Sequence, residues 1–133
     1  MTKEILCATD FSDSSKDALK WSIRLAKQLN SHLTILYTYR LFKQQGEVVI
    51  DMKKKIVEEA AKLFVAWEQE MLAGKGITYD FKSEVGFIAD RVEEYAKKNS
   101  IGFFVMAKGM TVCNKETVDE LLRNLQMPFV IVP

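Results

Sequence analysis

The chain has 133 residues, a length that favours a single domain with one hydrophobic core over residues 1–133. Its 19 basic and 18 acidic residues give a net charge of +1 and are interspersed along the sequence. This balance argues against a nucleic-acid partner and against binding to an acidic membrane surface.

The cysteine content and the apolar runs indicate where the protein works. Cys7 and Cys113 are too few for a disulfide framework, which is typical of a reducing compartment. No apolar stretch approaches the about 20 residues of a membrane span, and the first apolar run is broken by Asp10, too early for a signal peptide. We therefore expect a cytoplasmic protein that does not associate with membranes.

The first part of the chain predicts a strand followed by a helix. Residues 3–12 contain an apolar run that ends at Thr9 and Asp10, as expected of a buried strand that carries a carboxylate to its end. Ser12 is a good N-cap for a helix that should reach about Asn30. The apolar face expected for that helix consists of Ala18, Trp21, Leu25, Ala26 and Leu29.

The middle of the chain predicts a strand, a long helix and another strand. Residues 33–39 are β-branched and aromatic, as in a buried strand, and residues 40–50, with Gly46, are expected to form a loop. The helix that follows ends at residues 74–76, and residues 77–85 alternate between apolar and charged side chains, which is typical of an edge strand. The apolar face expected for the long helix consists of Met52, Ile56, Ala60, Leu63, Trp67 and Met71.

The last part of the chain repeats the alternation of helices and strands. Gly86 precedes a third helix, residues 102–107 predict a buried strand, and Asn114 or Thr117 can cap a final helix. Residues 129–132 form an uninterrupted apolar strand. Five strands that alternate with four helices predict an α/β fold, a parallel sheet with helices on both faces.

Four segments carry a resemblance to a known family: ILCATDFSDSSKDALKWSIRLAKQLNSHLTILYTY at residues 5–39, SEVG at 83–86, FFVMAKG at 103–109 and MPFVIVP at 127–133. With these segments the chain resembles the universal stress proteins, and the similarity covers nearly its whole length. The resemblance implies a Rossmann-like open sheet with strand order 3-2-1-4-5. The charged strand and the last strand would then form its two edges.

ATP-binding members of this family carry a glycine motif after the fourth strand: Gly, two residues, Gly, nine residues, Gly and Ser or Thr. Glycines let backbone N–H groups approach phosphates, and the following helix start adds partial positive charge. In this chain Ala107 replaces the first glycine, and Gly109 is the only glycine of the loop. The last two motif positions fall on Lys115 and Glu116, or bring in Thr117 after a shift of one residue. The resemblance therefore implies the branch without the ATP-binding motif, and we expect no cofactor.

The adenine side of the family's site is better preserved. Asp10 stands where ATP-binding members contact the base, and Thr38 stands where the family uses backbone at the end of its second strand. The candidate adenine-side pocket comprises Thr9, Asp10, Phe11, Thr38, Met106, Lys108 and Gly109. An alternative therefore stays open, in which ATP or AMP binds there.

Several of these residues also have plainer interpretations. Asp10 can serve as a cap for the helix that begins near Ser12. Lys108 and Lys115 can hold an anion, but solvated lysines are the favoured interpretation. Cys113 can be a redox-sensing thiol, but an unreactive surface thiol is favoured. His32 is expected at the surface.

We find no catalytic arrangement of residues in the sequence and expect no enzyme. The leading hypothesis is a dimeric regulatory protein of the stress response, without tight ATP binding, that acts through a protein partner or a small ligand; the alternative is an adenine-nucleotide sensor. A phosphoacceptor receiver ranks far below, because the third strand ends in Val85 and Gly86 without an Asp. Residues 129–132 lack the charges that protect an edge strand, so we expect a homodimer through this strand.

Overall fold

The computed structural model describes residues 3–41 and 48–133, so Gly46 and most of the expected loop around it lie outside the described residues. The strands run parallel in one five-stranded sheet of order β3-β2-β1-β4-β5, which confirms the predicted Rossmann-like α/β fold. The elements are β1 (Glu4–Thr9), α1 (Asp13–Leu29), β2 (Leu33–Tyr39), α2 (Val49–Trp67), the π-helical turn η1 (Glu68–Leu72), β3 (Tyr79–Val85), α3 (Ile88–Lys98), β4 (Ile101–Ala107), α4 (Lys115–Asn124) and β5 (Phe129–Val132).

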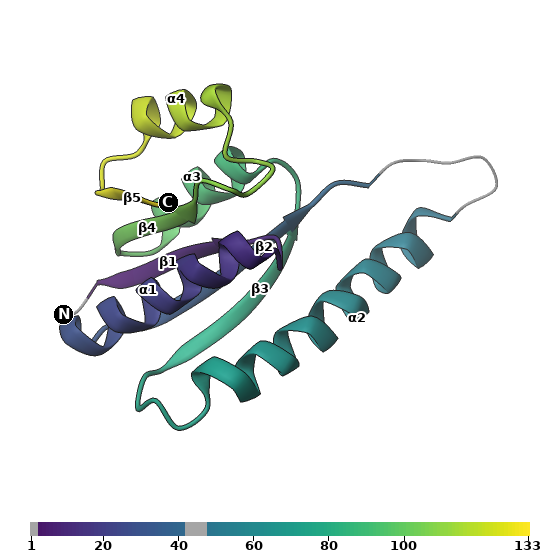
Figure 1. The fold of residues 1–133 in the computed structure, drawn as a ribbon. Helices are drawn as coiled ribbons and strands as arrows, with labels where there is room; N and C mark the ends of the chain where they lie inside the picture. Colours follow the sequence, from purple (N-terminus) through teal and green to yellow (C-terminus); the bar gives the residue numbers. More distant parts are fainter. Residues whose placement is uncertain (1–2, 42–47) are drawn as a thin grey trace.

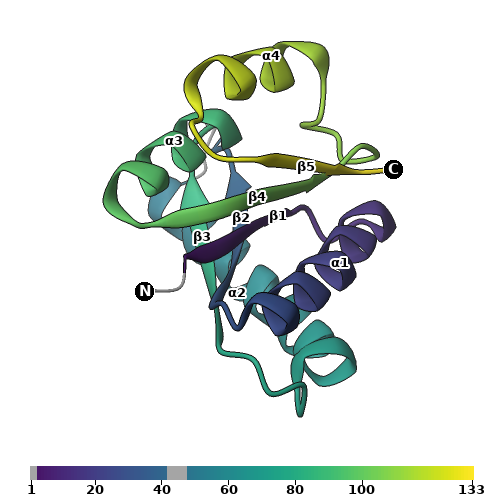
Figure 2. The same cartoon turned by 90° about the vertical axis from the view of Figure 1, so that its left-hand side faces the viewer.

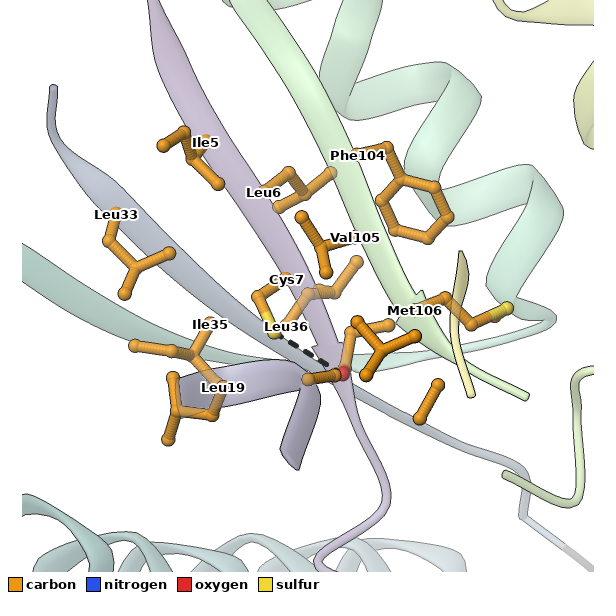
Figure 3. Close-up of a cluster of buried hydrophobic side chains, with 14 of the residues drawn as sticks. Ile5, Leu6, Cys7, Leu19, Leu33, Ile35, Leu36, Phe104, Val105 and Met106 are labelled. Carbon is orange, nitrogen blue, oxygen red and sulfur yellow. Dashed lines mark hydrogen bonds between the residues drawn. The ribbon is translucent and has the colours of Figure 1, made fainter. Parts of the chain in front are cut away.

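The helices cover both faces of the sheet, as Figures 1 and 2 show from two directions. Helices α1 and α2 lie on one face, and α3 and α4 lie on the other. The central strand β1 is covered on both sides, which explains its continuous apolar run from Ile5 to Ala8. Figure 3 shows the core around this strand, where Leu6 and Cys7 pack among side chains of β2, β4 and α1. Within the described ranges, no helix is both long enough and apolar enough to cross a bilayer.

Helix α1 has the predicted ends but a different buried face. Ser12 is the N-cap and accepts a hydrogen bond from the Ser15 N–H (3.2 Å), while the C-cap Asn30 is left-handed with φ of 51°. Trp21 and Leu29, expected in the core, are 51% and 45% exposed. The helix is turned so that two serines enter the core, where the Ser22 hydroxyl donates to the Ala18 carbonyl (2.8 Å). The buried face consists of Ser15, Ala18, Leu19, Ser22, Ile23 and Ala26.

Helix α2 also differs from its predicted face at one position. Leu63 was expected in the core but is 50% exposed, and the neighbouring Phe64 is buried instead. The Phe64 ring stacks on Phe81 of β3 with ring centroids 4.5 Å apart. In the π-helical turn η1 the Ala73 N–H donates to the Glu68 carbonyl five residues earlier (2.8 Å), one residue farther than in an α-helix, and the adjacent Met71 and Leu72 are both buried.

The two strands predicted to form the edges of the sheet, β3 and β5, occupy these positions. Among the strands of the described residues, β3 pairs only with β2, and β5 pairs only with β4. Since all strands run parallel, their carboxyl ends meet at one side of the sheet, where the chain enters α1, α3 and α4. Functional residues at strand ends are therefore expected to gather there.

Candidate functional site

An open cleft of about 750 Å³ lies at the carboxyl ends of the strands. It is bounded by the end of β2, the start of α3 and the loop that leads into α4. Clefts of this size and position bind ligands in open parallel sheets. Its lining includes Thr38, Arg40, Phe87, Asp90, Glu116 and Glu120. Of the seven residues predicted for the adenine-side pocket, only Thr38 lines this cleft.

Asp10 is engaged in hydrogen bonds within the protein. Its Oδ1 accepts the Ser12 N–H (3.0 Å), and the Ser12 hydroxyl donates to the same oxygen. Partial burial would raise the pKa of Asp10, but hydrogen bonds from Ser12, Ser15 and the Thr111 backbone outweigh it and hold this pKa below its ordinary value of 3.8. The carboxylate therefore stabilises the turn into α1 through Ser12 and lies near the loop before α4.

Thr9 and Phe11 shape the turn between β1 and α1. The buried Thr9 hydroxyl accepts the Phe11 N–H (3.0 Å) and lies 3.1 Å from the Ser15 hydroxyl. Phe11 has a left-handed backbone with φ of 61°, and its ring packs against Trp67 and Tyr37 at centroid distances of 5.1 and 5.3 Å. Aromatic packing thus holds a backbone conformation that is uncommon outside glycine.

The residues after β4 have structural contacts as well. Met106 is fully buried, and the backbone N–H of the exposed Lys108 donates to the Val132 carbonyl (2.8 Å). Gly109 lies against the side chain of Ser14 in α1, so close that a Cβ on residue 109 would overlap the Ser14 hydroxyl and its Cβ. The one glycine that remains in the loop is therefore required by packing.

Backbone N–H groups of the same loop already have acceptors. Met110 donates to the Ala107 carbonyl (3.2 Å), and Cys113 donates to the Met110 carbonyl (3.0 Å). At the start of α4 the N-cap Asn114 accepts the Thr117 N–H through its side chain (2.9 Å), which identifies Asn114 as the cap of the final helix. These N–H groups are not available to hold a phosphate.

The charges of the cleft were not foreseen from the sequence. Asp90, Glu116 and Glu120 line it, and Arg40 is the one cation among its described lining residues. The Arg40 guanidinium lies 4.4 Å from the centroid of the Phe87 ring. Asp90 is on α3 and Glu120 is on α4, so no local pattern in the sequence brings them together. The cleft is therefore acidic.

A group of three carboxylates at its rim has the composition of a cation site. Oxygen atoms of Asp90, Glu93 and Glu120 lie within 4.8 Å of one another. Hard cations prefer such ligands, but the Asn124 amide already donates to Glu93 (2.8 Å), and exposed acidic groups often cluster without a metal. We assign no metal to this group.

Three other candidate residues lie outside the cleft lining. Cys113 is half-buried, and burial raises the pKa of its thiol while Lys108 opposes the shift, so the reactive thiolate is disfavoured. Lys115 is exposed at the first position of α4. His32 was expected at the surface and is half-buried. Its ring nitrogens lie 2.8 Å from the Thr78 hydroxyl and 3.1 Å from the Asp80 carboxylate.

Comparisons with known proteins agree with this architecture. A model of the universal stress protein family matches residues 1–108. No curated protein matches the sequence.

Three solved structures illustrate the shared fold. Universal stress protein UspA from Lactobacillus plantarum has a TM-score of 0.81 at 16% identity, with 99% of this chain and 98% of that chain covered. A protein of the universal stress protein family from Burkholderia pseudomallei has a TM-score of 0.79 at 20% identity, with 99% and 96% covered. The universal stress protein from Archaeoglobus fulgidus in complex with dAMP has a TM-score of 0.65 at 11% identity, with 100% and 98% covered.

Proposed function

Since the chain belongs to the universal stress protein family, we propose that it is a non-enzymatic regulatory protein of the stress response that works as a homodimer without binding ATP tightly. The single observation that carries this proposal is the chemistry of the cleft, which opposes a triphosphate. The two free cysteines favour a reducing compartment, and we place the protein in the cytoplasm.

Repulsion is the first reason that a triphosphate is disfavoured. Asp90, Glu116 and Glu120 would face a multiply charged anion with only Arg40 among the described lining residues to offset them. Two like unit charges about 4 Å apart repel by about 4 kcal/mol at an effective dielectric constant of about 20. One cation cannot balance several such pairs.

The loop before α4 is the second reason. Phosphate loops bind through free backbone N–H groups, which glycines make accessible. Here Gly109 lies against Ser14, and the N–H groups of Met110 and Cys113 donate to carbonyls of the same loop. Binding a triphosphate on this loop would require these contacts to break first.

The edge strand β5 supports the homodimer. Ile131 is 41% exposed, and β5 carries no charged side chain along an edge that pairs with β4 on one side only. Such an edge is stabilised when a second copy pairs with it and continues the sheet. The dimer would also cover the neighbouring apolar side chains of Phe103 and Val130.

One observation favours a second candidate function, an adenine-nucleotide sensor. The cleft is large enough for a nucleoside monophosphate, and the related protein from Archaeoglobus fulgidus forms a complex with dAMP. A single phosphate would need only one cation, and Arg40 stands at the rim. Thr38 would then contact the adenine base of the nucleotide, as the sequence analysis expects for this alternative.

Calorimetric titration with ATP and AMP separates the two functions. We expect ATP to bind at the cleft with a dissociation constant weaker than about 100 μM. A matched variant, Thr111→Trp, fills the cleft at an exposed lining position and reports whether any binding occurs there. Micromolar ATP binding that this variant abolishes would contradict the proposal, and micromolar AMP binding abolished in the same way would favour the sensor.

A further inference from the structure

One face of α1 is basic although the chain as a whole is nearly neutral. Lys16, Lys20, Arg24 and Lys27 are spaced by four, four and three residues, which places them on the same side of the helix. Asp13 and Asp17 share this side near the start of the helix, so the basic part is its C-terminal half. The sequence is balanced overall, with a net charge of +1. The gathering of these cations is visible only once the helix is formed.

A groove of about 410 Å³ lies between this face and the end of η1. Lys20, Arg24 and Lys27 line it from α1, and Lys75 lines it from the turn after η1. The floor is apolar, because Ile23 and Met71 beneath it are buried. Gly74 and Gly76 are both left-handed, with φ of 75° and 74°, and shape the turn that carries Lys75 to the groove.

The groove contains more positive charge than the surrounding carboxylates balance. Glu70 is the one acid in its described lining, and the Lys16 ammonium already pairs with it (2.7 Å). No ion pair within 4.0 Å joins Lys20, Arg24, Lys27 or Lys75 to a carboxylate of the described residues. Four neighbouring cations therefore repel one another in the absence of an anion.

We propose that this basic groove binds a small polyanion, a molecule that carries two or more phosphate groups. Lysine supplies point charges to phosphates, and the guanidinium of arginine can donate two hydrogen bonds to a single phosphate. The Arg24 guanidinium lies 4.9 Å from the centroid of the Trp21 ring, which restricts its position beside the groove. Ligand binding would relieve the repulsion among the four cations.

The dimensions of the groove favour a small molecule over a nucleic acid. From Lys20 to Lys27 the helix rises by about 10 Å, the length of a short chain of phosphates. With the positive charge concentrated here and a net charge of only +1, the rest of the molecule is net negative, which disfavours a long polyanion. The groove and the cleft share no lining residue, and Lys27 lies near the end of α1 that is away from the carboxyl side of the sheet. The proposed groove ligand therefore does not depend on the function proposed for the cleft.

Inorganic tripolyphosphate is the probe for this site. We expect calorimetry at low salt to give one site per chain with a dissociation constant of about 100 μM or tighter, weakened by added sodium chloride. The variant Lys20→Gln/Lys27→Gln should bind at least about tenfold more weakly. The variant Lys53→Gln/Lys54→Gln removes the same charge from exposed positions of α2 and should bind as the wild type does.

Three results would overturn the proposal. The first is a wild-type dissociation constant for tripolyphosphate above about 1 mM at low salt. The second is an equal loss of tripolyphosphate affinity in both double variants, and the third is a loss of this affinity in the cleft variant Thr111→Trp. Glutamine keeps the helix propensity of lysine, so the variants should fold, as circular dichroism will check. Lys75→Gln removes a groove charge that lies in the turn after η1, outside α1, and should also weaken tripolyphosphate binding. Tripolyphosphate binding that is unchanged in Thr111→Trp supports a groove site that is separate from the cleft.

Discussion

Gly109 lies against the side chain of Ser14, so the loop after β4 rests directly on the first turn of α1. From its position after β4 alone, Gly109 could be taken for the remaining glycine of a phosphate loop. The contact gives it a packing role instead, because no other residue leaves room for the Ser14 side chain. The same contact holds the loop near the carboxyl end of β1, where the Thr111 backbone helps to lower the pKa of Asp10.

The variant Gly109→Ala should lower the free energy of unfolding by about 1–3 kcal/mol, the usual cost of forcing an extra group into a packed contact. Urea unfolding measures this loss. Because both the hydroxyl and the Cβ of Ser14 are in the way, Ser14→Gly/Gly109→Ala should recover part of it, with a coupling energy above about 0.5 kcal/mol. Additive effects of the two substitutions would show that the contact does not matter.

The fold was predictable because its strands are buried in ways that the sequence displays directly. The sequence of β1 is a continuous apolar run, and that of β3 alternates between apolar and charged residues. These patterns predicted a buried strand and an edge strand, and both predictions are confirmed. The buried faces of the helices were less visible. Ser22 enters the core by bonding its own helix backbone, so the apolar Trp21 beside it is left outside. Apolar periodicity alone does not reveal this exchange.

The site was harder to predict because its contacts join distant parts of the chain. The sequence identified Asp10, but not that the Thr111 backbone, about 100 residues later, would lie close enough to help lower its pKa. It identified the missing glycines, but not that Asp90 and Glu120 from two helices would face the same cleft. Local patterns predict which residues end a strand, whereas their partners depend on how the helices pack.

The acidity of the cleft predicts that removing carboxylates strengthens ATP binding. In the variant Glu116→Gln/Glu120→Gln, the loss of two repulsive charges should lower the ATP dissociation constant by about three- to tenfold at low salt. Calorimetry measures the change, with Asp51→Asn/Glu58→Gln on the exposed face of α2 as the control of equal charge. The same gain in the control would mean that long-range charge, and not the cleft, governs binding.

From the lowered pKa of Asp10 we predict that the free energy of unfolding decreases in acid. Its folded-state pKa lies below 3.8, so its contribution is present above about pH 4 and is lost as the pH falls through the folded-state value. At pH 7 the wild type should exceed Asp10→Asn by about 1 kcal/mol in free energy of unfolding, a value reduced by solvent screening. Urea unfolding from pH 7 to pH 3 should show this difference shrinking; a difference that does not change with pH would contradict the assignment.

A polar network at the opposite end of the sheet predicts a larger loss of stability. The fully buried Thr34 hydroxyl donates to Asp80 (2.8 Å), and the Tyr95 hydroxyl beside it donates to Glu4 (2.9 Å). Thr34→Val keeps the shape but removes the shared hydroxyl, which should cost about 1–3 kcal/mol of unfolding free energy. Thr38→Val on the same strand is the control, and because Thr38 is half-exposed its effect should stay within about 0.5 kcal/mol. Equal effects of the two variants would show that the network adds nothing.

The edge strand β5 predicts a dimer that a single charge disrupts. A largely apolar hollow of about 650 Å³ adjoins this edge, with Trp21 and Val130 in its lining and Lys20 and Arg24 on the side toward the basic groove. A second copy that pairs with β5 would cover the apolar side of this hollow. Ile131→Lys places a charge in the middle of the strand, where lysine opposes edge-to-edge pairing. Sedimentation velocity should give a dimer for the wild type and a monomer for this variant. Leu122→Lys is the control, because Leu122 is 62% exposed on α4 and should leave the dimer unchanged. A monomeric wild type, or a dimer that survives Ile131→Lys, would refute pairing through β5.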